Sequence, residues 1–273
     1  GKYQDQIISF ENSKLVGKKD FKIMSWNLSF VYGLGSTGEE NYIVHPKNYY
    51  LEKLDAIAEI IKQQDIDVVL LQETDFDSDK THNIDQLEYL SQKTGLYNLA
   101  RATTWKLKYL PYPFWPIKNH WKKINSGGGV LSRLPILENE VLIHEKPKSQ
   151  NWFYNFFYIG RFSQRVKVKI ADKEIVLFNN HLEAWDDKNR QQQVQTLVDW
   201  VNISTKNGDD VKVVAGDFNV VPDFAKNKSN FENSDSYEND QSYKILGQLS
   251  QYREVFGNAD HPQTYTFPSD KPL

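Results

Sequence analysis

The chain has 273 residues, which is enough for one large α/β domain or two smaller ones with a substantial buried core. Lysine and arginine number 33 against 36 aspartate and glutamate residues, and this net charge of -3 excludes the overall positive field of general nucleic-acid binders. The chain contains no cysteine, so disulfides, thiolate metal sites and a cysteine nucleophile are also excluded. It also contains no apolar run of transmembrane length.

The first 20 residues are polar and lack a clear period, and we expect an extended lead-in to a single domain over residues 21–273. Because residue 1 is glycine rather than methionine, we expect that an upstream tag, signal peptide or anchor was removed. The localisation therefore stays open between the bacterial cytoplasm and an exported or membrane-anchored location. Residues 21–28 alternate apolar and polar side chains, which predicts a strand that ends near Asn27.

A strand, a helix and a second strand are predicted in succession. Residues 48–64 carry apolar side chains at helical spacing, and residues 68–71 form a β-branched and aliphatic run that leads into Glu73. The right-handed connection of such a unit places both strand ends at one sheet edge, so Asn27 and Glu73 are expected to be neighbours.

Taken singly, Asn27 is best explained as a turn amide and Glu73 as a surface acid. A carboxylate that directly follows buried apolar residues is costly to desolvate, however, unless a cation or hydrogen-bond donors compensate for it. Oxygen ligands of this kind suit Mg²⁺ or Mn²⁺, which keep several waters and need only one or two protein carboxylates. Glu73 is therefore a candidate metal ligand.

Residues 84–96 are predicted to form a helix that stops at Gly95. Residues 105–121 then contain three prolines within six residues, which predicts a rigid aromatic loop rather than a regular element. Trp105 and Trp115 are candidate substrate-binding residues, because exposed rings stack on bases or lie at a lipid interface; folding over an edge of the core is an equal alternative. An anionic partner is favoured by the surrounding lysines, which are Lys106, Lys108, Lys118, Lys122 and Lys123.

The glycines at residues 127–129 lack the lysine and the following helix of a phosphate-binding loop, and instead predict a strand under close backbone contact. A second aromatic cluster occupies residues 151–162, and core packing is expected for most of its rings. Arg161 is harder to explain by packing and is a candidate for binding a phosphate group.

Two further strands end in polar groups. Residues 174–181 form an apolar run that ends at His181, for which the alternative is a hydrogen-bonded core histidine. After a predicted helix through residues 190–201, residues 211–215 form a β-branched strand. A glycine then allows a sharp turn before Asp217 and Asn219, for which the alternative is an ordinary turn. Residues 223–244 are predicted to be a solvated insertion, followed by a short helix near residues 243–249.

Together these segments resemble the endonuclease/exonuclease/phosphatase superfamily. The matching stretches span nearly the whole chain in the family's order. They are Trp26-Asn27, Leu71-Gln72-Glu73, Gly129-Val130-Leu131-Ser132-Arg133, Asn180-His181-Leu182 with Arg190 and Gln193, Gly216-Asp217-Phe218-Asn219 and Thr264-Tyr265-Thr266. The resemblance implies a four-layer, deoxyribonuclease-like α/β sandwich of two packed mixed sheets flanked by helices.

The resemblance also implies a Mg²⁺-dependent phosphoesterase, with Mn²⁺ as an alternative ion. In that family the position of Glu73 holds the metal with Asn27 beside it, those of His181 and Asn219 donate to phosphoryl oxygens, and that of Asp217 orients or deprotonates water. Thr264 is a further candidate substrate-binding residue. The expected substrate is a nucleic acid, a phospholipid headgroup or an inositol phosphate, with a slight preference for a phosphodiester. Nothing indicates a stable protein partner, and we expect a monomer.

The chain departs from the family's pattern near residue 273. Family members continue through a further strand with an aspartate and a Ser-Asp-His motif, whereas the similar stretch here reads Ser269-Asp270-Lys271. If the protein ended there, we would expect a sheet without its C-terminal strand and little hydrolysis, although Glu73 would still bind metal. The alternative function is a catalytically impaired binding module whose aromatic loops contact a protein or a membrane.

Overall fold

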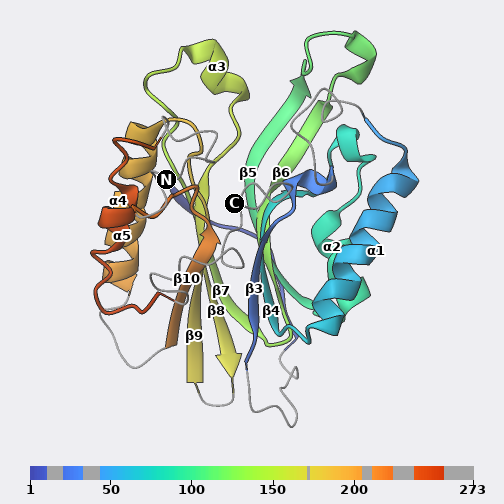
Figure 1. The fold of residues 1–273 in the computed structure, drawn as a ribbon. Coiled ribbons are helices and arrows are strands. Elements are labelled where there is room, and N and C mark those ends of the chain that lie inside the picture. The colour runs from blue at the N-terminus through green and yellow to red at the C-terminus, as the bar shows by residue number, and fades with distance from the viewer. Residues whose placement is uncertain (11–20, 33–43, 171–172, 205–210, 224–236, 255–273) are drawn as a thin grey trace. The chain divides into compact units, whose positions relative to one another are not determined.

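The computed structural model describes the chain except for residues 11–20, 33–43, 171–172, 205–210, 224–236 and 255–273 (Figure 1). The chain forms two compact units. The first contains residues Gly1–His144, Asn151–His181 and Asp210–Asp217, and the second contains Glu145–Gln150, Leu182–Asp209 and Phe218–Leu273.

The first unit contains two five-stranded mixed sheets, seen edge-on in Figure 1. The first sheet has the order β1 (Lys2–Gln4), β7 (Ile136–Ile143), β8 (Phe162–Ile170), β9 (Lys173–His181) and β10 (Val211–Asp217). The second has the order β2 (Ile7–Ile8), β5 (Asn98–Leu110), β6 (Lys122–Ser132), β4 (Val68–Asp75) and β3 (Ile23–Asn27). The pairs β9–β10 and β3–β4 are parallel, and the other neighbouring strands are antiparallel.

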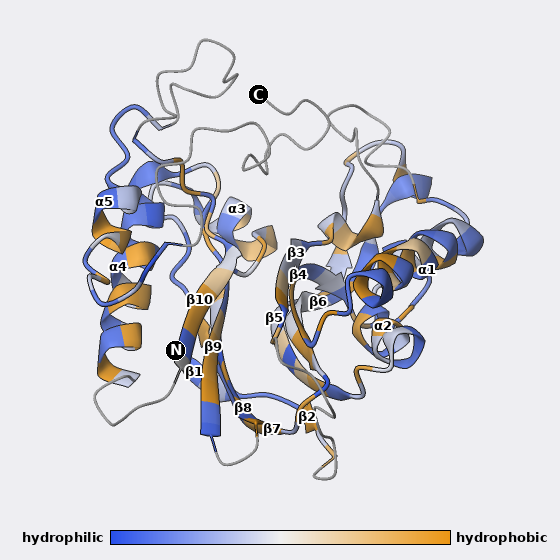
Figure 2. Ribbon diagram, turned by 60° about the horizontal axis from the view of Figure 1, so that its bottom comes forward, coloured by the Kyte–Doolittle hydropathy of each residue, from blue (hydrophilic) through white to orange (hydrophobic). Residues whose placement is uncertain are grey.

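Strand β4 is buried on both faces, which explains its unbroken apolar sequence. Val68 and Leu70 belong to the core between the two sheets, together with Val166 and Leu177 of the first sheet. Val69 and Leu71 point the other way and join a second core, which the helices α1 (Lys47–Gln63) and α2 (Gln86–Thr94) complete. Figure 2 shows both of these helices with hydrophobic and hydrophilic residues, as expected for helices that cover a sheet.

Four buried amide side chains connect the two sheets through their shared core. Gln72 Nε2 of β4 donates to Asn179 Oδ1 at 2.6 Å, Asn179 Nδ2 donates to Gln164 Oε1 at 3.1 Å, and Gln164 Nε2 donates to Asn139 Oδ1 at 2.9 Å. Each amide also bonds backbone carbonyl oxygens, including those of Leu71 and Arg101. Because unpaired amides would be costly in this core, the row favours one alignment of the sheets next to Glu73.

Helix α2 ends at Gly95, as its sequence predicts, and begins after Asp85. The carboxylate of Asp85 accepts a hydrogen bond from the backbone nitrogen of Glu88 at 2.9 Å, and Gly95 ends the helix with a φ of 77°. The remaining short helices of the first unit are η1 (Ser29–Val31), η3 (Asp79–Thr81), η4 (Ile117–Asn119) and α3 (Trp152–Phe157).

The second unit contains α4 (Asp187–Ser204) and α5 (Ser242–Leu246). Arg190 of α4 is fully buried, and its Nε donates to Asp240 Oδ2 at 2.7 Å while its Nη1 donates to the carbonyl oxygen of Glu183 at 3.0 Å. Arg190 therefore connects the segment before α4 with the segment before α5. In the part of the chain that the structure describes, no helix has the length and apolar character needed to cross a bilayer.

The predicted fold class, an α/β sandwich of two packed mixed sheets with flanking helices, is confirmed. Three local expectations differ from the structure. Residues 2–8 add a strand to each sheet, β5 continues through Leu110 where a loop was expected, and β7 and β8 were not predicted. The prediction of one domain over residues 21–273 stays a prediction.

Candidate functional site

The parallel pairing of β3 with β4 brings Asn27 and Glu73 together, as the strand-helix-strand pattern predicted. Asn27 lies opposite Gln72, and its Nδ2 atom donates to Glu73 Oε1 at 3.1 Å. The pairing of β4 with β6 shifts register between Leu71 and Thr74, and Glu73 within this bulge has a φ of 50°. A left-handed backbone is unfavourable for glutamate, and bulges of this type redirect a side chain at the end of a strand.

The other sheet supplies the second half of the cluster. In the parallel pair β9–β10, Asp217 lies directly opposite His181. Gly216 precedes Asp217 with a φ of 128°, and a Cβ atom there would come within 2.2 Å of the carbonyl oxygen of Asn180. Only glycine fits this close contact, so the Gly-Asp order of the sequence determines where the Asp217 carboxylate emerges.

Asn27 connects the two carboxylates. Its Nδ2 atom donates to Asp217 Oδ2 at 2.8 Å in addition to Glu73, and its Oδ1 atom accepts a hydrogen bond from the backbone nitrogen of Ser29 at 2.9 Å. This last bond fixes the amide so that its nitrogen faces both acids. Two carboxylates from different sheets are thereby held within hydrogen-bond reach of a single nitrogen atom.

Two cationic or polar nitrogen groups face Glu73 from the first sheet. His181 Nε2 lies 3.4 Å from Glu73 Oε1, and Arg161 Nη1 contacts the same imidazole nitrogen. Both side chains are buried, at 2% and 3% exposure, whereas the side chain of Glu73 is 21% exposed. The cluster thus combines two carboxylates, an amide, an imidazole and a guanidinium group.

Burial by itself would raise the pKa of Glu73, but the charges and hydrogen bonds around it outweigh this effect. His181, Arg161 and Asn27 together lower the pKa of Glu73 to about 2. Glu73 is therefore ionised at neutral pH, which is the state required of a carboxylate that binds a cation.

The donor set is compatible with a hard divalent cation. In the described ranges, no group of three or more histidine, cysteine, aspartate or glutamate side chains is arranged to hold a metal. Mg²⁺ binds through one or two carboxylates and retains water, so Glu73 with Asp217 nearby fits the ligand preference of such an ion. Asn27 directs its nitrogen rather than its oxygen at the two acids, which suits a residue that orients the ligands.

None of the other predicted site residues is among the described groups of this cluster. Asn219 belongs to the second unit, where its Nδ2 atom donates to the carbonyl oxygen of Leu182 at 2.9 Å. Trp105 is only 7% exposed and packs between Phe30 and Trp121, whereas Trp115 is 78% exposed. Thr264 lies outside the described residues.

The expectation that most rings of residues 151–162 pack in the core was wrong. Tyr158 and Phe162 are buried, and Phe157 packs against the core. The four others, on α3, are exposed: Trp152, Phe153, Tyr154 and Phe156. The helix is only six residues long and five of the six are aromatic, so its sequence does not indicate which of its faces is covered.

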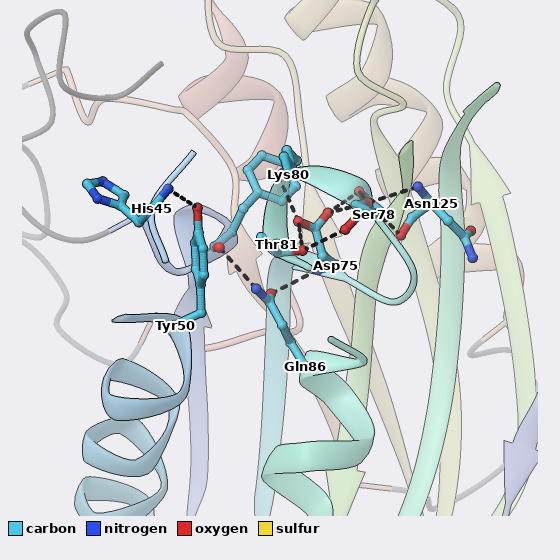
Figure 3. Close-up of polar contacts among 10 residues, drawn as sticks. His45, Tyr50, Asp75, Ser78, Lys80, Thr81, Gln86 and Asn125 are labelled. Carbon is cyan, nitrogen blue, oxygen red and sulfur yellow. Dashed lines mark hydrogen bonds and ion pairs between the residues drawn. The ribbon is translucent and has the colours of Figure 1, made fainter. Parts of the chain in front are cut away.

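Sequence reasoning missed a buried ion pair two residues beyond Glu73. Asp75 Oδ2 lies 2.7 Å from the ammonium group of Lys80, and both side chains are fully buried (Figure 3). The ammonium group also lies 3.6 Å from the centre of the Phe30 ring and, farther away, 5.1 and 4.9 Å from the centres of the Tyr32 and Trp121 rings. Burial lowers the pKa of Lys80, and Asp75 opposes that effect.

The carboxylate of Asp75 is also saturated by hydroxyl groups. Ser78 Oγ and Thr81 Oγ1 each donate to it at 2.9 Å, and Ser126 Oγ makes a further contact. The alternation of small polar residues after β4 was the available signal for this cluster, but it did not reveal which acid the hydroxyl groups would surround.

Comparisons with known proteins agree with this architecture. A sequence profile described as the Endonuclease/Exonuclease/phosphatase family matches residues 24–272. No curated protein sequence matches the chain significantly.

Solved structures share the fold at low sequence identity. A mannosyl-6-phosphatase from Bacteroides thetaiotaomicron VPI-5482 is 16% identical with a TM-score of 0.52, over 84% of this chain and 71% of that one. An endonuclease/exonuclease/phosphatase from Beutenbergia cavernae DSM 12333 is 16% identical with a TM-score of 0.53, over 85% of this chain and 54% of that one. This chain therefore spans about half the length of the Beutenbergia protein.

Proposed function

Because the chain belongs to the endonuclease/exonuclease/phosphatase family, we propose that it is a metal-dependent phosphoesterase that hydrolyses its substrate by direct attack of water. The observation that carries the proposal is the arrangement around Asn27, whose one nitrogen atom holds the Glu73 and Asp217 carboxylates together beside His181. Family members are hydrolytic phosphoesterases, and this cluster contains carboxylate, amide and imidazole groups that can take part in such a reaction.

Each residue of the cluster has a role in the proposal. Glu73, ionised and oriented by Asn27, would hold Mg²⁺ or Mn²⁺. When bound, such an ion supplies charge stabilisation at the phosphoryl oxygens. Asp217 accepts the proton of the attacking water, because its carboxylate is ionisable and lies at the same strand edge. No covalent intermediate is required.

His181 and Arg161 donate to the phosphoryl oxygens in this proposal. Their nitrogen atoms face Glu73 from the opposite sheet, so an anion that enters beside Glu73 meets two donors without a rearrangement of either sheet. Preorganised donors of this type stabilise the negative charge that develops in the transition state. Asn219 is proposed as a further donor on the strength of its place in the Gly-Asp-Phe-Asn stretch.

The test is a hydrolysis assay of the full natural protein against a Glu73→Gln variant, in Mg²⁺, in Mn²⁺ and in a chelator. The panel contains single-stranded and duplex DNA, phospholipid vesicles, an inositol polyphosphate and a sugar phosphate. The sugar phosphate is included because one structural relative is described as a mannosyl-6-phosphatase.

Hydrolysis that requires both the metal and Glu73 supports the proposal, and the substrate that is hydrolysed identifies the specificity. Activity that survives the chelator, or that Glu73→Gln leaves unchanged, would contradict it.

A further inference from the structure

Two protrusions of the first unit lie at the same edge as the candidate site. Strand β5 is antiparallel to β6, which is antiparallel to β4, so β5 ends at the edge where β4 carries Glu73. Strand β8 begins with Phe162 opposite His181, so the preceding α3 also lies at this edge. Figure 1 shows α3 and the tip of the β5–β6 hairpin extending at the same end of the unit.

The hairpin extends well beyond the sheet. The last pair between β4 and β6 joins Asp75 to Ser126, whereas β5 and β6 continue to pair as far as Leu110 with Lys122. At about 3.3 Å per residue, this stem reaches roughly 15 Å past the neighbouring strand. The tip can therefore contact a flat surface while the body of the unit remains away from that surface.

The tip exposes a group of bulky apolar side chains. Trp115 is 78% exposed, and the others of the group are Tyr109, Phe114 and Ile117. On α3, Trp152 is 80% exposed beside three further exposed rings, which gives a second apolar protrusion. The two protrusions are joined at their bases, where Thr104 Oγ1 of β5 donates to the carbonyl oxygen of Gly160, three residues after α3, at 3.1 Å. Large exposed apolar groups of this kind mark interaction surfaces.

The charge of the hairpin is opposite to that of the chain as a whole. Residues 105–123 contain five lysines and no acidic residue, in a protein whose net charge is -3. Lys123 pairs with Asp77 at 2.9 Å, but Lys106, Lys108, Lys118 and Lys122 are exposed and form no ion pair within the described ranges. Exposed lysines flanking an apolar tip suit a partner that is both anionic and apolar.

We propose that the hairpin tip and α3 together dock onto an anionic lipid membrane, with Trp115 and Trp152 in the interface and the hairpin lysines against the headgroups. Tryptophan, tyrosine and lysine have this distribution at membrane surfaces, where apolar insertion and electrostatic attraction reinforce each other. Docking in this way would place the edge that carries Glu73 and His181 at the membrane.

A single-stranded nucleic acid is the less favoured occupant. Such a strand needs cations along its whole path as well as rings for stacking. Residues 149–160, which include α3, contain no charged side chain at all, and the hairpin tip carries the aliphatic Ile117. Docking onto an anionic membrane, in contrast, requires lysines on only one of the two protrusions.

The test is co-sedimentation of the full protein with vesicles of phosphatidylcholine alone and with 30% phosphatidylserine. We expect binding to the anionic vesicles that weakens as salt is raised. Trp115→Ala and Trp152→Ala should each weaken it about tenfold. The triple change Lys106/Lys108/Lys118→Gln should weaken it about 100-fold, and the phosphatidylcholine vesicles should bind weakly throughout.

Matched controls keep the result specific. Tyr97 is exposed just before the opposite end of β5, so Tyr97→Ala should bind like the unchanged protein. The triple change Lys47/Lys53/Lys62→Gln on α1 alters the net charge equally and should also have little effect. Glu73→Gln should bind normally, which separates this inference from the proposed phosphoesterase activity.

Three results would overturn the inference. They are failure to bind the anionic vesicles, equal binding by the control and tip variants, and binding to a single-stranded oligonucleotide that depends on Trp115 while the vesicles stay unbound.

Discussion

Glu73 and Asp75 lie two residues apart on β4, yet their surroundings differ. Asp75 is fully buried and meets three hydroxyl groups and a dedicated ammonium group. Glu73 is 21% exposed, and Asn27 and His181, which contact it, come from other strands and also face other groups. The hydrogen-bonding capacity of Asp75 is filled from within, whereas Glu73 retains access to solvent.

The difference distinguishes a structural carboxylate from a functional one. A buried acid whose oxygen atoms are all occupied has no capacity left for a ligand, and its removal is felt as lost stability. An ionised acid that remains partly exposed among donors can accept a cation or approach an anion, and its removal is felt as lost activity. We therefore expect mainly a loss of activity when Glu73 is replaced and mainly a loss of stability when the contacts of Asp75 are broken.

The largest expected effect is on activity at Glu73. Glu73→Gln removes the charge while keeping the shape, so we expect kcat/KM for phosphoester hydrolysis to fall about 1,000-fold, or about 4 kcal/mol of transition-state stabilisation. The melting temperature should also fall, because a pKa of about 2 in the folded protein means that the fold itself favours the ionised carboxylate. Kinetics in Mg²⁺ and a thermal scan check both parts. A variant that stays active but unfolds easily would show that Glu73 is structural.

The next effect is on stability at Lys80. Lys80→Met keeps the length of the side chain but leaves Asp75 as a buried charge without its cation, and we expect a loss of about 3 kcal/mol in the free energy of unfolding. Because three hydroxyl groups still donate to Asp75, we expect a loss at the lower end of the range for broken buried ion pairs. Urea denaturation measures it.

The double variant Asp75→Asn/Lys80→Met serves as the control for that measurement. It removes both charges and should recover part of the stability lost in Lys80→Met. If the double variant lost at least as much free energy of unfolding as the two single variants added together, the Asp75–Lys80 pair would not be the source of the loss.

His144 is a third buried titratable group, and the effect of its burial can be tested by changing the pH. Burial lowers the pKa of His144 to about 3, and its Nε2 atom lies 2.8 Å from Ser163 Oγ. The unfolded chain, with a histidine pKa of about 6.5, takes up the proton first, so stability is lost as the pH falls below about 6.5.

Between pH 7 and pH 5 this loss should reach about 2 kcal/mol in the unchanged protein and be absent in His144→Gln. The difference in urea unfolding between the two proteins isolates the imidazole from carboxylates that titrate in both. Parallel pH profiles would show that His144 takes up its proton as readily in the folded state as in the unfolded state.

The smallest effect is expected for an exposed ion pair. Lys93 Nζ lies 2.8 Å from Asp55 Oδ1, close to the Asp75–Lys80 distance, but both side chains are about half exposed. Lys93→Met should leave the urea midpoint almost unchanged, because solvent screens an exposed pair of this kind. A cost as large as that of Lys80→Met would mean that burial does not decide the worth of such pairs here.

Local sequence determined most elements that carry the candidate site. The apolar run of β4, the helical period of α1, the Gly95 signal of α2 and the Gly-Asp pair at the end of β10 each depend on residues close in sequence. The parallel pairing of β3 and β4 followed from the connecting helix, which is why the contact between Asn27 and Glu73 could be predicted.

Only the tertiary structure determined which other side chains contact one another at the site. Contacts of Asn27 with Asp217, of Glu73 with His181 and of Gln72 with Asn179 cross between two sheets, and the packing that aligns those sheets is distributed over many side chains. The sequence showed that the chain contains aromatic clusters and lysines, but not that Trp105 is buried while Trp115 is exposed. Burial depends on which surfaces meet, and residues far apart in the sequence supply those surfaces.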